Sequence, residues 1–147
     1  MLKDDLKILL ATEYAFVIKA QFFHWNCEGS DFAQLHAFFG SIYEEVYGNS
    51  IDKTAEYIRV LDDYAPGSLE RFSELSEVQG QTRVPRARLM IEELLSNNEQ
   101  VIALLNRCFA AAEAENQQGI ANFIAELLDA HGKWGWQLKS FLKDQRA

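Results

Sequence analysis

Apolar residues recur at steps of three and four over four long stretches of this chain, a pattern typical of amphipathic α-helices. These stretches predict helices over residues 3–26, 31–64, 86–113 and 118–143. Within the second stretch, the apolar residues Val46 and Ile51 are five positions apart, around Gly48. A long helix commonly absorbs one extra residue as a π-bulge, and a simple helix break is the alternative interpretation.

The segment between the second and third stretches contains a turn and a further short helix. Pro66–Gly67 is a turn signal, and Ser68 opens a short amphipathic stretch. Residues 78–85 are predicted to form a loop. Two long helices, a crossover with a short helix and two more long helices predict an all-α, ferritin-like four-helix bundle. The length fits one domain over residues 1–147.

The composition narrows the function classes. The formal net charge is −8, which disfavours binding to nucleic acid or to anionic membranes and suits a host for cations. No stretch approaches the ~20 apolar residues of a transmembrane helix, and the N-terminal sequence MLKDDLKILL does not resemble a secretory signal. Cys27 and Cys108 are too few for a disulfide framework. We therefore expect a cytoplasmic protein without a membrane partner.

Candidate chemistry is concentrated between Phe22 and Glu56. His24 and His36 lie on either side of the first predicted turn, which brings them to the same end of the bundle. Asp52 and Glu56 are four residues apart and share one helix face. Imidazole and carboxylate together suit a borderline divalent metal such as iron.

Helix geometry separates these side chains into two half-sites. Asp52 follows His36 by sixteen residues, which is about 24 Å along a helix axis at 1.5 Å per residue. One subunit therefore cannot place all four side chains on one metal ion. Two copies packed with residues 31–64 antiparallel would bring the half-sites together and generate two equivalent sites. The chain has no Glu-x-x-His motif, the usual mark of a di-iron centre within one bundle.

Each half-site also has a purely structural interpretation. The two histidines could cap and pack helix ends. The carboxylates could form a solvated face, with Glu56 paired to Arg59 three residues on. His131 lies in an apolar stripe beside Trp134 and fits a core or interface histidine.

The segments His24-Trp25-Asn26, Leu35-His36 and Asp52 to Ala55-Glu56 resemble the Dps proteins, the miniferritins known as DNA-binding proteins from starved cells. The crossover Ala65–Leu69 and the segment Trp136-Gln137-Leu138 are also similar to that family. The resemblance covers nearly the whole chain.

This resemblance implies a hollow homododecamer with ferroxidase activity. Such a cage oxidises ferrous iron, preferably with hydrogen peroxide and otherwise with dioxygen, and stores the ferric mineral inside. The implied ligands are His24 and His36 of one subunit and Asp52 and Glu56 of its two-fold mate. Trp25 would lie beside the iron, where it could take up oxidising equivalents as part of the catalytic site.

Three departures from the family pattern stand out. Gly40 occupies a place where the family often has Asp, and the spacing from His36 to Asp52 is one residue longer than usual. The chain also lacks a Lys-rich N-terminal extension, so with its net charge of −8 we expect little or no DNA binding. Gly40 favours an alternative function, that of a catalytically weak Dps-fold shell with a protective or binding role.

Overall fold

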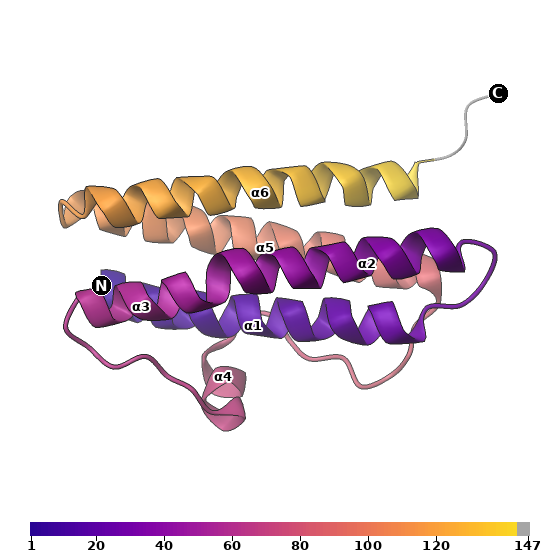
Figure 1. The fold of residues 1–147 in the computed structure, drawn as a ribbon, viewed down its shortest axis with the longest axis horizontal. Helices are drawn as coiled ribbons and strands as arrows, with labels where there is room; N and C mark the ends of the chain where they lie inside the picture. The colour runs from indigo at the N-terminus through magenta and orange to yellow at the C-terminus, as the bar shows by residue number, and fades with distance from the viewer. Residues whose placement is uncertain (144–147) are drawn as a thin grey trace.

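Four long helical rods lie side by side in the computed structural model, which describes residues 1–143 (Figure 1). This is the all-α, ferritin-like four-helix bundle that the periodicity predicted. In chain order the helices are α1 (Leu2–Asn26), α2 (Phe32–Val46), the π-helix η1 (Tyr47–Ile51), α3 (Asp52–Val60), α4 (Leu69–Leu75), α5 (Ala87–Ala114) and α6 (Gln118–Leu142).

The rods form two antiparallel hairpins. In the first, α1 is followed by the continuous rod α2–η1–α3, and in the second α5 is followed by α6 (Figure 1). The segment between α3 and α5 crosses from one end of the bundle to the other, and α4 within it packs against α1. The long crossover and its short helix are therefore confirmed.

The extra residue near Gly48 is absorbed as a π-helix, so the bulge prediction is confirmed and the helix-break alternative is wrong. A π-turn closes over five residues instead of four. The buried positions Val46, Ile51 and Ile58 therefore stay on the core side of one continuous rod despite the five-residue step.

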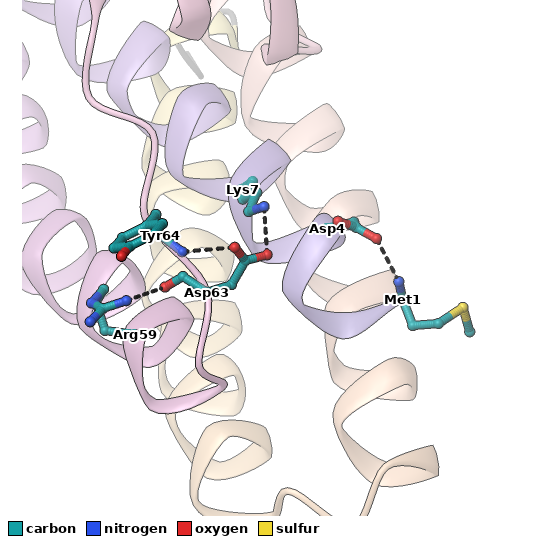
Figure 2. Close-up of polar contacts among 6 residues, drawn as sticks. All are labelled: Met1, Asp4, Lys7, Arg59, Asp63 and Tyr64. Carbon is teal, nitrogen blue, oxygen red and sulfur yellow. Dashed lines mark hydrogen bonds and ion pairs between the residues drawn. The ribbon is translucent and has the colours of Figure 1, made fainter.

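The second predicted helix, over residues 31–64, ends four residues early, at Val60. Asp62 has a φ of +65°, in the left-handed region that Asp tolerates better than most residues but that ends a helix. The next residue, Asp63, forms an ion pair with Lys7 of α1 at 2.8 Å, which fixes the start of the crossover against the first helix (Figure 2). This long-range contact has no signal in the local sequence.

The other long helices begin and end within one residue of their predicted limits. Gly29, in the turn after α1, has a φ of +112°, where other residues would be strained. Asp31 is the N-cap residue of α2, although its side chain makes no capping hydrogen bond. At α4, the Ser68 hydroxyl accepts a hydrogen bond from the Arg71 backbone N–H at 3.1 Å, a standard N-cap.

One polar network lies inside the apolar core. His131 of α6 is 1% exposed, and its Nε2 lies 3.0 Å from Oε2 of the fully buried Glu13 of α1. Its Nδ1 lies 2.8 Å from Oδ1 of Asn98 of α5, whose amide donates to the His131 carbonyl at 2.9 Å. The interpretation of His131 as a core histidine is confirmed. Within residues 1–143, no helix has the length and apolarity needed to cross a membrane.

Candidate metal centre

His24 and His36 meet at the end of the first hairpin. His24 lies in the last turn of α1 and His36 in the first turns of α2, joined by the short turn that follows Asn26. Their rings are stacked, with centroids 3.8 Å apart and planes 13° apart. The sequence prediction that these two residues share one end of the bundle is confirmed.

The two histidines hold each other through reciprocal hydrogen bonds. His36 Nδ1 donates to the His24 carbonyl at 2.7 Å, and His24 Nδ1 donates to the His36 carbonyl at 2.5 Å. A carbonyl oxygen can only accept, so these bonds assign the proton of each neutral ring to Nδ1. Each Nε2 is left with its lone pair. This is how proteins commonly orient histidines that bind metal ions.

Aromatic side chains flank the histidine pair on both sides, with Phe32 stacked on His36 and Tyr43 tilted by 55° against His24. The Phe32 ring lies 5.0 Å from that of His36, and the Tyr43 ring lies 5.4 Å from that of His24. We call Phe32, His36, His24 and Tyr43 the ring column. Trp25, the next residue after His24, is 63% exposed. The predicted oxidation-sensitive residue therefore lies at the surface beside the histidine pair, where an incoming partner or oxidant can reach it.

Asp52 and Glu56 lie elsewhere in the same chain. Both are exposed on α3, which occupies the end of the hairpin opposite the turn after α1 (Figure 1). The π-helix decides which way the two carboxylates point. Tyr43, Tyr47, Asp52 and Glu56 follow one another at steps of four, five and four residues, and the step of five spans the π-turn. The carboxylates thus continue the row of side chains that begins at the ring column.

The proposed pairing of Glu56 with Arg59 has a competitor in the structure. The Arg59 guanidinium donates to the Asp63 carbonyl at 2.9 Å and lies 4.8 Å from the centre of the Tyr64 ring. Figure 2 shows Arg59 directed at these two residues. Arg59 thus contacts the residues that follow the end of α3.

Within one chain, His24 and His36 lie together, whereas Asp52 and Glu56 lie at the other end of the hairpin. Within residues 1–143, no three side chains of His, Cys, Asp or Glu come close enough together to hold a metal ion. A four-ligand site made of both half-sites remains a prediction about two copies of the chain.

The cysteines show no sign of metal chemistry. Both are free and buried. Burial raises the pKa of the Cys27 thiol, and it raises the pKa of Cys108 to about 12. Both are therefore protonated at neutral pH, whereas metal ions and electrophiles react with the thiolate. The Cys27 thiol contacts the His24 carbonyl at 3.8 Å, so Cys27 is a neighbour of the site.

A hollowed apolar surface flanks the histidine pair. A groove of about 610 Å³ lies between α1 and the α4 crossover, and one of about 400 Å³ lies between α1 and the α2–η1 rod. Both are lined by Tyr14, Ile18 and Gln21 of α1. Large exposed apolar side chains border these grooves: Ile18, Trp25, Tyr47 and Leu69. We call this surface the α1 face.

Sequence reasoning missed the polar core network and the packing role of Gly40. Glu13 falls between the apolar pairs Leu9/Leu10 and Phe16/Val17, on the buried face of α1. A charged residue at a core position is a usable signal for a buried partner. Gly40 lies four residues after His36 and therefore falls on the same face of α2. A residue without a side chain at that place is a signal that the ring of a neighbouring histidine fills the space.

Comparison with known proteins supports the fold and the family. Residues 3–147 match the model of the ferritin-like domain. An uncharacterized low temperature-induced protein of Nostoc is 33% identical over 92% of this chain and 76% of its own length. The structure of Dps from Thermosynechococcus elongatus superposes with a TM-score of 0.94 at 26% identity, covering 98% of this chain and 91% of that one.

A second Nostoc relative, named a nutrient stress-induced DNA-binding protein, is 27% identical over 95% of this chain and 76% of its own length. Its name counts against the expectation of little DNA binding, which rests on net charge and on the N-terminal sequence. The family model and the Dps structure agree with the bundle described above. The chain belongs to the Dps family of ferritin-like proteins.

Proposed function

We propose that this protein is a ferroxidase and iron store that protects against oxidative damage, and that ferrous iron binds at sites shared by two subunits. One observation carries the proposal: each Nδ1 of the His24/His36 pair is bound to the other residue's carbonyl. Both Nε2 atoms are thereby kept as lone-pair donors. Two fixed imidazoles at a surface, with a carboxylate pair on the same rod, fit the ligand preference of ferrous iron.

The α1 face supports the shared site. It lies beside the half-exposed histidines and carries exposed apolar side chains over two adjoining grooves. Burial of such a surface against a second copy would exclude water from the metal site and stabilise the pair. A two-fold contact between α1–α2–α3 hairpins would set His24 and His36 of one copy opposite Asp52 and Glu56 of the other.

The protein's part in the reaction is to bind, orient and keep water out. Two ferrous ions each lose one electron, and hydrogen peroxide accepts both electrons and two protons to give two water molecules. The carboxylates offset the growing positive charge of the iron. Trp25, exposed beside His24, would accept oxidising equivalents that escape the iron.

The first test measures iron oxidation with the purified protein. Ferrous iron and peroxide are added, and the formation of ferric product is followed by absorbance. We expect wild type to exceed buffer, and both His24→Ala/His36→Ala and Asp52→Asn/Glu56→Gln to fall to the buffer rate. Glu99→Gln/Glu113→Gln, which removes two exposed acids of α5, is the matched control and should oxidise iron as wild type does.

A complementation test separates a shared site from one within a chain. The His24→Ala/His36→Ala and Asp52→Asn/Glu56→Gln chains are unfolded together and refolded as a mixture. Random pairing makes half of the dimers mixed, and each mixed dimer has one intact site of its two. Activity should therefore return to about a quarter of wild type. No recovery would contradict the shared site.

A catalytically weak shell is the second candidate, and Gly40 is the observation that favours it. In that case the cage would form but would not speed iron oxidation. Light scattering distinguishes assembly from activity: we expect the mass of a dodecamer, and a monomer would exclude any shared site. The buried, protonated thiols of Cys27 and Cys108 fit the expected cytoplasmic location.

A further inference from the structure

The ring of His24 occupies the space above Gly40. Phe32, His36 and Gly40 are successive residues at a spacing of four along α2, so their side-chain positions form a row on one face. The rings follow the order Phe32, His36, His24 in that row. The imidazole of His24 from α1 thus stands where the side chain of residue 40 would otherwise be.

Little room exists for any side chain at this position. A Cβ atom added to Gly40 would lie 3.0 Å from Cε1 and 3.1 Å from Nδ1 of the His24 ring. The first distance lies at the limit of real carbon contacts and the second is closer than most. The ring cannot turn aside freely, because its Nδ1 is bonded to the His36 carbonyl and its face is stacked on His36.

We propose that Gly40 is a positioning residue of the metal centre and sets its metal selectivity; this inference rests on the proposed function. By leaving space for His24, Gly40 makes this half-site a pair of imidazoles to which residues 1–143 bring no third His, Cys, Asp or Glu. Imidazole suits Fe²⁺, Co²⁺ and Zn²⁺, whereas hard ions such as Mn²⁺ and Mg²⁺ prefer oxygen ligands. Because residue 40 adds no oxygen ligand, a site completed by Asp52 and Glu56 of a second copy keeps a larger share of imidazole, which favours the borderline ions.

The test compares Gly40→Ala with Gly132→Ala. A Cβ at Gly132, an exposed glycine of α6, would meet nothing within 4 Å, so this control repeats the glycine-to-alanine change without the contact. Co²⁺ is titrated alone into each assembled protein by calorimetry. We expect Gly40→Ala to bind Co²⁺ at least about tenfold more weakly, the usual effect of disturbing the residues that orient a ligand. Affinity within twofold of wild type would overturn the proposal.

Selectivity is measured by competition between Co²⁺ and Mn²⁺. Wild type should prefer Co²⁺, and Gly40→Asp, which forces a carboxylate into the space of the His24 ring, should shift the preference toward Mn²⁺. An unchanged ratio would overturn the selectivity claim. A general loss of stability would weaken both ions alike and leave the ratio unmoved.

X-ray absorption of Co²⁺-loaded wild type needs no variant. It should show imidazole nitrogen bound to the ion, and a coordination shell without imidazole would overturn the proposal. The two proposals fail separately. If wild type binds Co²⁺ through imidazole but does not speed iron oxidation, the ferroxidase function is wrong and Gly40 keeps its role. If wild type oxidises iron and Gly40→Ala does so equally, with unchanged Co²⁺ affinity, the reverse holds.

Discussion

The three histidines of this protein occupy two contrasting environments. His24 and His36 lie half-exposed at the end of a hairpin, and within residues 1–143 Nδ1 is the one hydrogen-bonded nitrogen of each ring. His131 lies in the middle of the bundle, 1% exposed, with both ring nitrogens within 3.0 Å of protein oxygens. The first environment leaves two lone pairs available, and the second leaves none.

The difference shows how a hydrogen-bond partner decides what a histidine can do. Asn98 donates through its amide to the His131 carbonyl, so its oxygen faces Nδ1, which must carry a proton. Nε2 then faces a Glu13 oxygen, and one proton must lie between these two groups. That network stabilises the bundle centre. At the hairpin end, the Nδ1 atoms of His24 and His36 are bonded to backbone carbonyls, so each Nε2 can bind a metal ion.

The largest expected effect comes from breaking the buried network. His131→Ala would leave Glu13 buried without a partner, which costs about 3–5 kcal/mol of unfolding free energy. Urea denaturation measures this loss. Replacing both residues, as in Glu13→Leu/His131→Leu, should cost less, because no isolated charge remains. If the double variant loses as much as the single one, the pair is not the stabilising unit.

The next prediction concerns His24 and His36, where we expect a large effect on metal binding and a small effect on stability. His24→Ala removes one ligand and one hydrogen bond from a half-exposed site, so we expect a stability loss of only about 1 kcal/mol. Co²⁺ affinity should fall by at least about 100-fold, beyond the effect of losing an orienting neighbour. A variant that keeps Co²⁺ affinity but loses several kcal/mol would make His24 a structural residue like His131.

A smaller effect is expected from removing the extra residue of the α2–η1–α3 rod. Deleting Gly48 restores a four-residue step between Val46 and Ile51, so the rod can continue as an ordinary α-helix with the same buried face. Asp52 and Glu56 should keep their direction. We expect iron oxidation within twofold of wild type and an unchanged or higher Tm in calorimetry. A loss of activity in a stable protein would show that the π-turn itself orients the carboxylates.

The smallest effect concerns the partly buried ion pair between Lys7 and Asp63, which holds the start of the crossover against α1. Lys7, together with the Tyr64 N–H, holds the pKa of the Asp63 carboxyl below its ordinary value (Figure 2). A lowered folded-state pKa stabilises the protein above the unfolded-state pKa of about 4, and the stabilisation is lost as pH falls through the folded-state pKa. Asp63→Asn should lower Tm slightly at pH 7, and the difference should vanish in acid. A difference that persists in acid would contradict this assignment.

The sequence alone determined the fold, because the bundle depends on local periodicity. The apolar steps over residues 3–26, 86–113 and 118–143 located three helices to within one residue. The five-residue step from Val46 to Ile51 located the π-helix, since a buried face cannot change sides within one rod. The composition of the turn after α1 placed His24 near His36.

Only the tertiary structure decided how the side chains meet. The start of the crossover after α3 is held by Asp63 reaching Lys7, fifty-six residues away in sequence. The Glu13–His131 pair joins two helices through residues that are 118 positions apart in sequence. At Gly40, where the family that the sequence resembles often has Asp, the His24 ring fills the space of a side chain. Such contacts depend on the packing of one helix against another, and helical periodicity specifies only which face is buried.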